Sequence, residues 1–536
     1  MKKTVEQGSA FPDNTAMRKT LLALMLLAAL ISCDSSTDGG PSRPSVPGTS
    51  TSESTAVAED MTYYMEEDLP SSYDFTDSAY TVEDGVVTIT DDSGENLRYT
   101  ISGETLDGIT VTTESAVELV LDNVTVEATS SPALTLEGDG TVFIKLIGDS
   151  SLSSTKKKGI SGDMCSVVIY SEDGGSLSVT AYKKDAINLD GGRLRVLSGT
   201  LSVTVPESAE SGDGIDVFAY VQDGGDVTVE ALCSEHDEES KGIKAKGDDD
   251  SSAYPDPMGY IAINGGTLSI TSYGKALTAN WDYSEDGDGE LDGANGTDPA
   301  ASLYINGGTI TITTIGEPVE EGSYAADSSY SLSPEGMEGK QNLVINGGTI
   351  EITATDDAVN AGSSLIINGG SLYAESSAND ALDTNGTLEI NGGTIVAIGS
   401  AAPETGIDSD SDRNFTYTGG TVVALGGESN NTPSSSSTTG KAVTCTASST
   451  MAITTSSGDP VIAYTLPSSS LSGYNVLFCS SDLATGSYVY TTGAEITAGD
   501  DFHGLALGDF TLSGGKSSSF RISSTVTSVK SGRSQD

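Results

Sequence analysis

Apolar and polar residues alternate over short stretches between about residues 109 and 427, and glycine-rich turns separate these stretches. At one such stretch, Ile350 and Ile352 alternate with Thr349, Glu351 and Thr353. Alternation with a period of two predicts half-buried β-strands, and the region shows no helical periodicity. The pattern therefore predicts an all-β fold built from many short strands.

A four-residue motif accompanies this alternation. Ile-Asn-Gly-Gly occurs five times, at residues 263–266, 305–308, 345–348, 367–370 and 390–393, and Thr or Ser follows each copy. Looser copies lie at residues 173–177, 198–201, 223–227 and 418–422. A second element, in which Ala or Gly precedes an apolar residue between two variable positions, begins at residues 158, 185, 213, 241, 275, 335, 357, 380 and 405. The smallest spacing of this element, 22 residues, gives the length of one structural repeat.

A repeat of this length with three short strands and Gly-Gly or Asn-Gly turns predicts a right-handed parallel β-helix. We expect about ten to eleven coils, stacked ~4.8 Å apart, with residues such as Ile345 facing inward. The Asn of each turn is expected to form an amide ladder along the stack. A propeller would need a period of roughly 40 residues or more.

The ends of the chain differ from this repeat region. Arg18 and Lys19 precede an apolar run over residues 21–31 that ends in Ser32-Cys33. This order resembles a bacterial lipobox, so residues 1–33 are predicted to be a lipoprotein signal peptide with lipid on Cys33. The alternative is an ordinary signal peptide in which Cys33 is incidental. The lipoprotein reading places the protein in the bacterial cell envelope, exposed to the periplasm or cell surface, with the lipid as its only membrane contact.

The remaining boundaries follow from composition. Residues 34–60 are a flexible Ser/Thr/Pro linker, residues 61–108 an N-terminal β cap and residues 109–427 the β-helix. Residues 428–440 form a second linker before a small C-terminal β domain at residues 441–536. Within that domain Cys445 and Cys479 are candidates for a disulfide, whereas Cys165 and Cys233 are expected to be buried packing residues.

Charge narrows the choice of partner. The chain carries 78 acidic and 25 basic residues, for a net charge of −53, which disfavours nucleic acid and favours cations. Stacking aligns the variable positions of the second element into columns, and in the last four coils these positions are mostly Asp, Asn and Glu. Calcium accepts such oxygen ligands in tolerant geometry. We therefore expect calcium between coils near Asp356, Asp357, Asn360, Asp380, Asp383 and Asp408; the alternative is a solvated acidic edge of turn-forming residues.

The insertion at residues 280–299 is a second calcium candidate. Asp282, Asp286 and Asp288 lie at the first, fifth and seventh places of a stretch that resembles an EF-hand loop, with Gly287 at the sixth. Gly293 stands where an EF-hand has its bidentate Glu. The segment is therefore either a loose calcium loop or a solvated acidic loop.

Lysines and aromatic residues offer candidate contacts to a sugar polymer. Lys241, Lys244 and Lys275 share the columns with the acids, and could form a basic stripe for an acidic glycan or relieve repulsion between carboxylates. Trp281 and Tyr283 in the insertion could present a platform for a sugar ring or pack the loop. Thr-Ile-Thr-Ile-Thr at residues 309–313 suggests an ice-binding face, but Thr-x-Thr does not recur regularly enough on adjacent coils.

Catalytic motifs are weak. The chain has two histidines and no nucleophile elbow, phosphate-binding loop or His-based zinc motif. Paired acids abound, but without distances no one pair is informative about glycoside hydrolysis.

The repeated Ile-Asn-Gly-Gly-Thr strands, joined to turns of the form Asp-Ala/Gly-apolar-Asn/Asp, resemble the bacterial carbohydrate-binding domain family of secreted parallel β-helix proteins. The resemblance covers about residues 80–430 and a tail segment at residues 476–488. It implies a pectate-lyase-like fold, binding of cellulose and pectic acid polymers, and calcium at the Asp and Asn positions named above. Lys158, Lys241, Lys244 and Lys275 depart from that pattern, which puts calcium in their coils in doubt.

The expected function is non-catalytic binding of a polysaccharide, from plant cell walls or another acidic glycan, with calcium as a structural or bridging cation. A calcium-dependent, pectate-like polysaccharide lyase is one alternative, although no arginine or lysine is clearly placed as its base. A surface adhesin or structural protein is another, because a fold does not determine function.

Overall fold

The computed structural model describes residues 69–103, 105–234, 240–248, 259–282, 301–319, 332–435 and 438–529. All of them belong to one compact unit, Val57–Asp536. In this part of the chain no helix is long and apolar enough to cross a membrane. Several predicted features lie outside the described residues, namely the lipidated Cys33, the linker at residues 34–60, Tyr283, Asp286, Asp288 and the side chains of Trp281 and Asp282.

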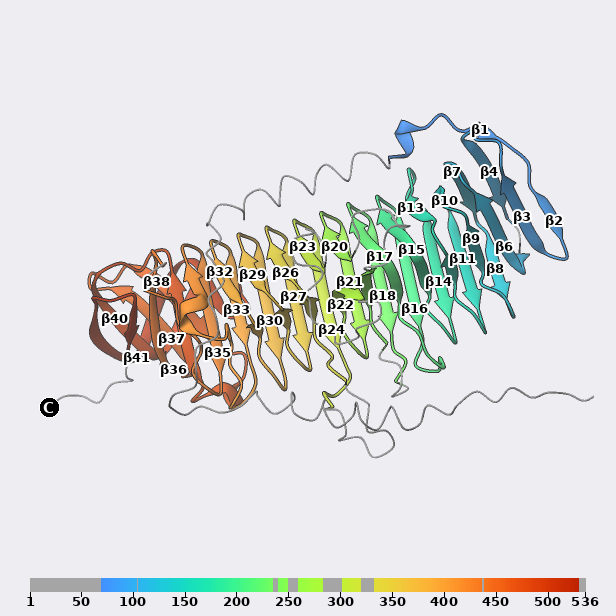
Figure 1. Ribbon diagram of the computed structural model, residues 1–536. Coiled ribbons are helices and arrows are strands. Elements are labelled where there is room, and N and C mark those ends of the chain that lie inside the picture. Colours follow the sequence, from blue (N-terminus) through green and yellow to red (C-terminus); the bar gives the residue numbers. More distant parts are fainter. Residues whose placement is uncertain are drawn as a thin grey trace, which may run out of the picture. The chain divides into compact units, whose positions relative to one another are not determined.

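The repeat region is a parallel β-helix, which confirms the predicted fold class (Figure 1). Each coil contributes one strand to each of three parallel ladders, here called faces 1, 2 and 3 in the order in which a coil visits them. Strands of successive coils pair in register along each face, for example Ile310 with Ile350 and Ile350 with Leu372 on face 3.

Face 1 consists of β3 (Val86–Asp91), β6 (Gly108–Thr113), β9 (Leu134–Glu137), β12 (Ile160–Gly162), the first parts of β15 (Ile187–Val196) and β17 (Ile215–Gln222), β19 (Ile243–Asp248), β22 (Leu277–Asp282), β25 (Met337–Gly339), β28 (Val359–Ala361) and β31 (Leu382–Thr384). Face 2 consists of β1 (Thr76–Asp77), β4 (Leu97–Ser102), β7 (Val117–Asp122), β10 (Thr141–Ile147), β13 (Ser166–Tyr170), the second parts of β15 and β17, β20 (Tyr260–Ile263), β23 (Ser302–Ile305), β26 (Asn342–Ile345), β29 (Ser364–Ile367), β32 (Thr387–Ile390) and β34 (Phe415–Tyr417). Face 3 consists of β5 (Thr105–Leu106), β8 (Thr125–Ala128), β11 (Asp149–Ser154), β14 (Ser176–Ala181), β16 (Thr200–Val205), β18 (Asp226–Ala231), β21 (Thr267–Ser272), β24 (Thr309–Thr314), β27 (Thr349–Ala354), β30 (Ser371–Ser376), β33 (Thr394–Ile398) and β35 (Thr421–Gly426).

The alternation in the sequence places one apolar column of each face inside the stack. Along β27, Ile350 and Ile352 are fully buried, whereas Thr349, Glu351 and Thr353 are exposed. Because every coil repeats this arrangement in register, the inward residues join into one continuous core cluster that runs from Val87 to Cys479. Burial of apolar surface along this column is the main stabilising contribution to the stack.

The Gly-Gly pair is required where the chain turns from face 2 to face 3. Gly266 has a positive φ of 79°, which side chains disfavour. Its neighbour Gly265 lies so close to the preceding coil that a Cβ there would stand 2.8 Å from the carbonyl oxygen of Asp223. The second Gly thus supplies the conformation and the first allows the close approach between coils.

The predicted amide ladder is present at these turns. Asn306 donates to the Asn264 side-chain oxygen at 2.8 Å, and Asn346 donates to Asn306 at 2.7 Å. Asn368 and Asn391 continue the ladder at 2.8 and 3.0 Å. Each amide therefore donates to the coil before it and accepts from the coil after it.

Parallel pairing begins within the segment predicted as an N-terminal cap. β3 pairs with β6 and β4 with β7, both parallel, so part of residues 61–108 already forms coils of the helix. The reason lies in the alternation of β3, where Val87 and Ile89 are buried in the same core. β2 (Thr81–Glu83) pairs antiparallel with β3 at this end, and the 3₁₀ turn η3 (Pro70–Ser72) precedes β1.

The C-terminal domain predicted at residues 441–536 is joined to the last coil rather than separate from it. β39 (Asn475–Ser480) pairs antiparallel with β35, and β36 (Lys441–Thr446) and β42 (Val526–Ser528) continue the same sheet. The strands β37 (Thr450–Thr455), β38 (Pro460–Thr465), β40 (Gly486–Phe502) and β41 (Leu505–Ile522) close into a barrel. The 3₁₀ turn η6 (Ser469–Leu471) lies between β38 and β39, and η5 (Asp412–Asn414) lies before β34 in the last coil.

Outward-facing apolar residues of the last coils explain why the barrel packs there. Val396 and Val423 point away from the helix core, yet both are fully buried in a second cluster with Met451 and Tyr464 of the barrel. In earlier coils the equivalent positions are polar. The change from polar to apolar on the outer side of face 3 thus marks where the barrel docks.

The suggested disulfide between Cys445 and Cys479 is wrong, because all four described cysteines are free and buried. Cys445 contributes to the cluster beneath the barrel, whereas Cys479 contributes to the core of the helix, so their side chains lie on opposite sides of one sheet. Cys165 and Cys233 are buried in packing positions, as predicted.

Candidate functional site

The variable positions after the apolar residue of the second element form a continuous column on face 1, here called the acidic column. Strand pairing aligns Ser161, Asn188, Asp216, Lys244, Thr278, Glu338, Asn360 and Asp383 in consecutive coils. A parallel bridge between Leu382 and Ile407 brings Asp408 beside Asp383 in the next coil. The column predicted from the repeats is therefore a real row of neighbouring side chains.

Lysines neutralise the carboxylates in the middle of the acidic column. The ammonium nitrogen of Lys244 lies 2.8 Å from a carboxylate oxygen of Asp216 and 3.8 Å from one of Asp213. Although burial lowers the pKa of Lys244, the charges of Asp216 and Asp213 raise it above its ordinary value. Lys158 takes a similar place by donating to the Asn188 side-chain oxygen at 2.6 Å.

Lys275 forms ion pairs with two glutamates of the adjacent coil. The first of them, Glu335, is 60 residues further along the chain. Lys275 lies 2.6 Å from Glu335 and 3.0 Å from Glu338, and the exposed fractions of these three side chains are 12%, 7% and 2%. Thr278 donates to Glu338 at 2.6 Å, and Lys340 forms a further ion pair with it. Burial opposes the charge of Glu338, but the two lysines lower its pKa to about 2.

These contacts bear on the two interpretations of the lysines. Lys244 and Lys275 each lie between two carboxylates of face 1, as the relief of carboxylate repulsion predicts. Their role as glycan contacts stays a prediction, and so does that of Lys241, whose backbone N–H binds Asp213 at 2.8 Å.

Aspartates at the first position of the second element accept hydrogen bonds from the backbone of the following coil, which the sequence analysis did not predict. Asp357 accepts the backbone N–H of Asp380 in the following coil at 3.0 Å, and Asp185 accepts that of Asp213 at 2.9 Å. Asp380 accepts the N–H of Thr405 in the same way. One oxygen of each such carboxylate therefore ties two coils together.

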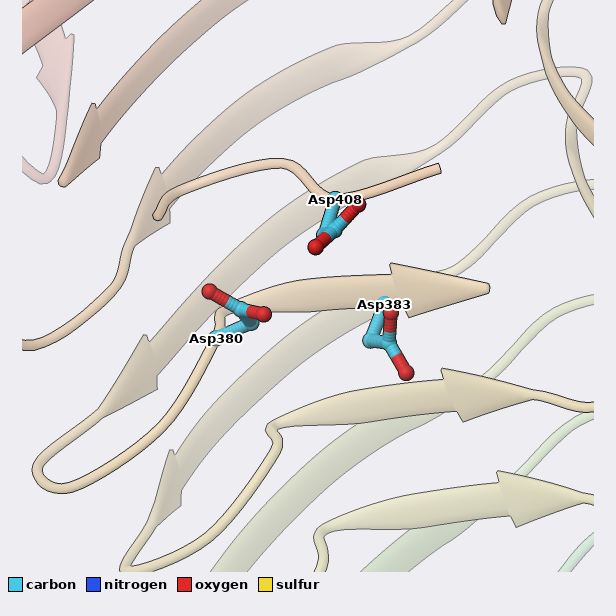
Figure 2. A group of neighbouring side chains, drawn as sticks. All are labelled: Asp380, Asp383 and Asp408. Atoms are coloured by element: carbon cyan, nitrogen blue, oxygen red, sulfur yellow. The ribbon is translucent and has the colours of Figure 1, made fainter. Parts of the chain in front are cut away.

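Three carboxylates converge at the C-terminal end of the acidic column. Asp380 precedes β31, Asp383 lies on that strand and Asp408 lies on the adjoining coil (Figure 2). One oxygen of each lies within 4.8 Å of the others. Among the described residues, no lysine or arginine forms an ion pair with any of the three. This group, here called the Asp380 cluster, contains three of the six residues predicted to bind calcium on the coils.

The Asp380 cluster is electrostatically unfavourable as it stands. Burial raises the pKa of Asp380 to about 7, and the charges of Asp408 and Glu404 act in the same direction. Burial likewise raises the pKa of Asp383 to about 7, with Asp380 and Asp408 adding to the effect. Carboxylates in this condition bind a proton or a cation readily.

The other predicted ligands lie next to the cluster but are bonded differently. Asp356 accepts hydrogen bonds from Ser333 at 2.8 Å and from Asn379 at 2.7 Å. Asn360 donates to Glu335 at 3.1 Å and to Asp357 at 3.3 Å. Burial raises the pKa of Asp357 well above its ordinary value, and the charges of Asp383 and Glu335 act in the same direction.

The donor set of the Asp380 cluster suits a hard cation. All of its candidate ligands are oxygen atoms, and calcium prefers such ligands. The hydroxyl of Thr405, whose N–H binds Asp380, is buried and has no hydrogen-bond partner among the described residues. Asp408 keeps one oxygen available while the other accepts the N–H of Asp410 at 3.0 Å.

Comparison with known proteins identifies the family of this chain. No protein with a curated description and no solved structure matches the chain. The profile of the family described as "Carbohydrate-binding domain-containing protein" matches residues 83–381, a range that includes most of the coils described above. The match covers more than half of the chain. This chain therefore belongs to the family of carbohydrate-binding domain-containing proteins.

Proposed function

We propose that this protein binds polysaccharide at the bacterial surface without cleaving it, is held there by lipid on Cys33, and binds calcium at the Asp380 cluster. Family membership supports the carbohydrate partner. One observation carries the calcium proposal, namely that three carboxylates converge there, whereas lysines pair with Asp216, Glu335 and Glu338 in earlier coils.

The contrast along the acidic column is the physical argument. Where the column contains Asp216 or Glu338, a lysine from a neighbouring coil supplies the positive charge. Where it contains Asp383, no described cationic side chain does so. Carboxylates this close repel each other unless a proton or cation intervenes. Calcium in this position would join the last two coils and could also bridge to a carboxylate of an acidic glycan.

The proposal predicts a defined calcium response. Isothermal titration of the metal-stripped protein should reveal at least one calcium site, and Asp383→Asn with Asp408→Asn should abolish it. Asp173→Asn, which changes an exposed acid in a distant turn, is the matched control and should leave the titration unchanged. An isotherm of the double variant like that of the wild type would show that calcium binds at another site.

The binding activity itself needs a panel of glycans. A soluble form beginning at Asp34 would be incubated with insoluble and acidic polysaccharides, once with calcium and once with chelator. We expect retention without any ultraviolet-absorbing unsaturated product in the supernatant. Release of such a product would instead establish the lyase alternative, and failure to bind any glycan would favour the adhesin alternative.

The lipid anchor rests on the order of residues 18–33 and is tested separately. Cells that express the full chain should incorporate labelled fatty acid into the protein. Cys33→Ser should lose both the label and the membrane association. A wild type without label would indicate an ordinary signal peptide, and membrane association of the variant would indicate another attachment.

A further inference from the structure

The outer side of face 3 carries serine and threonine in three registered columns between β11 and β24. Its central column is uninterrupted and consists of Ser151, Ser178, Ser202, Thr228, Ser269 and Thr311. The columns on either side contain hydroxyls in every coil except at three positions, where Asp149, Asp226 and Glu230 stand instead. We call this surface the hydroxyl face.

Sequence inspection for Thr-x-Thr misses this regularity because serine occupies many of the positions. Strand pairing reveals it, since β11, β14, β16, β18, β21 and β24 pair in parallel without a register shift. Neighbouring hydroxyls are therefore ~4.8 Å apart along the stack and roughly 6.6 Å apart along a strand. The result is a two-dimensional grid rather than a scatter of polar residues.

The central hydroxyls are available to a partner. Thr228 and Thr311 are exposed, and the remaining members of the central column are half-exposed or exposed. Within the described part of the chain, Ser178, Ser202, Thr228, Ser269 and Thr311 form no side-chain hydrogen bond. Other hydroxyls of the same face do form one, as Ser153 does with the carbonyl oxygen of Val126 at 3.1 Å. The central column thus keeps its donors and acceptors for solvent or a ligand.

Charge separates this face from the rest of the protein. The chain has a net charge of −53, but the six strands of the hydroxyl face carry only three charged residues, Asp149, Asp226 and Glu230. These strands are β11, β14, β16, β18, β21 and β24. Face 1 contains the acidic column instead. On face 2, outward aromatic residues such as Phe143 and Tyr304 are buried. The hydroxyl face is therefore an extended part of the described helix surface that is both open and nearly uncharged.

We propose that the hydroxyl face is the docking surface for an uncharged, extended polysaccharide, an inference that rests on the proposed polysaccharide-binding function. A hydroxyl donates one hydrogen bond and accepts others, as the hydroxyls of a sugar do. Lack of charge on both partners avoids the cost of desolvating ions. Both partners also repeat along their length, so contacts that are individually weak add up over several coils. An acidic polymer would meet Asp149, Asp226 and Glu230 and gain no cation.

The test removes hydroxyls while keeping shape. The face variant combines Ser202→Ala, Thr228→Val, Ser269→Ala and Thr311→Val in the full mature protein. Its matched control removes four hydroxyls from an outward column of face 1, with Thr88→Val, Thr110→Val, Thr135→Val and Ser161→Ala. Circular dichroism and chemical unfolding would verify that both variants fold like the wild type.

Retention would be measured on microcrystalline cellulose and chitin as uncharged probes and on immobilised polygalacturonate as the acidic probe. We expect the wild type and the control to bind an uncharged probe, and the face variant to bind it at least about tenfold more weakly. Equal retention of the face variant would overturn the inference and leave polysaccharide binding intact. Retention of the wild type on the acidic probe alone would do the same.

Two further outcomes concern other partners. If the wild type bound none of these glycans, both this inference and the proposed function would fail. If the wild type inhibited ice recrystallisation and only the face variant lost that effect, the hydroxyl face would be an ice-binding surface and the inference would be overturned.

Discussion

His503, in the turn between β40 and β41, stacks its imidazole on the ring of Tyr373 of β30, with ring centroids 3.8 Å apart. Its Nε2 atom also lies 3.3 Å from a carboxylate oxygen of Glu351 on β27. Tyr373 in turn donates to Glu375 at 2.5 Å. The tip of the barrel hairpin thus contacts the outer side of face 3 at the two coils that follow the hydroxyl face.

This contact predicts that His503 stabilises the docked hairpin. His503→Ala should cost about 1 kcal/mol, the usual value of an aromatic pair beyond its buried area. The loss should appear as faster hydrogen exchange in β40 and β41 with little change in the coils. His503→Phe keeps a ring for stacking and should restore most of the protection. Unchanged hydrogen exchange in the alanine variant would show that the apolar cluster around Met451 and Tyr464 is sufficient to hold the hairpin in place.

A larger effect is expected at Lys275. Lys275→Met removes the ammonium group from between Glu335 and Glu338 and leaves two buried carboxylates facing each other. Breaking a buried ion pair in this way costs roughly 3–5 kcal/mol. Chemical unfolding would measure the loss.

Lys183→Met is the control for that variant, because Lys183 pairs with Glu210 at an exposed position. An exposed pair contributes about 0–1 kcal/mol, so the control should unfold almost like the wild type. Similar losses in both variants would mean that burial does not decide the contribution of these pairs.

The raised pKa values of Asp380 and Asp383, both about 7, predict how calcium-free stability depends on pH. An unfolded aspartate titrates near 3.9, so between about pH 4 and pH 7 the folded protein holds more protons than the unfolded chain. The contribution of these groups is therefore complete below about pH 4 and is lost as pH rises to 7.

Unfolding midpoints of the metal-stripped wild type and of Asp383→Asn, compared across this range, would check the prediction. The variant should show a smaller decline between pH 5 and 7.5, because its amide does not ionise. Parallel declines in the two proteins would assign the pH dependence to other buried acids. Added calcium competes with protons for these oxygens, so its stabilising effect should grow over the same range.

The amide ladder gives a prediction about the turns. Asn346 donates to Asn306 at 2.7 Å and accepts from Asn368 at 2.8 Å, so Asn346→Ala removes two hydrogen bonds. Each contributes about 1 kcal/mol or less at such a solvated site. Chemical unfolding should show a loss of about 1–2 kcal/mol, and Asn346→Asp, which keeps the acceptor, should lose less. An alanine variant as stable as the wild type would mean that water replaces the ladder.

The sequence predicts the coil well because strand period and turn chemistry are local. Alternation around Ile350 and the Gly-Gly pair at 347–348 determine which residues face inward and where the chain turns, and stacking then follows from repetition. Alignment of the repeats also predicted the row that contains Asn360 and Asp383, which strand pairing confirms.

Contacts between distant segments could not be predicted in the same way. The repeat alignment places Lys275 and Glu335 in adjacent coils, but it does not show that Lys275 also reaches Glu338 at another position of that coil. Cys445 and Cys479 lie on neighbouring strands but on opposite sides of the sheet, which depends on pairing register. Likewise, Val396 and Val423 are apolar on the outer side of the helix because the barrel covers them, and the repeats do not show this cover.

The amide ladder has a consequence for how this protein can change in size. Since every ladder Asn bonds to one coil on each side, removal of a whole coil brings two asparagines together that can bond as the original neighbours did. Loss of a single residue within a strand instead moves the apolar side chains of the rest of that strand to the opposite side of the sheet. Evolution can therefore lengthen or shorten the stack by complete repeats, and with it the hydroxyl face, without redesigning either end.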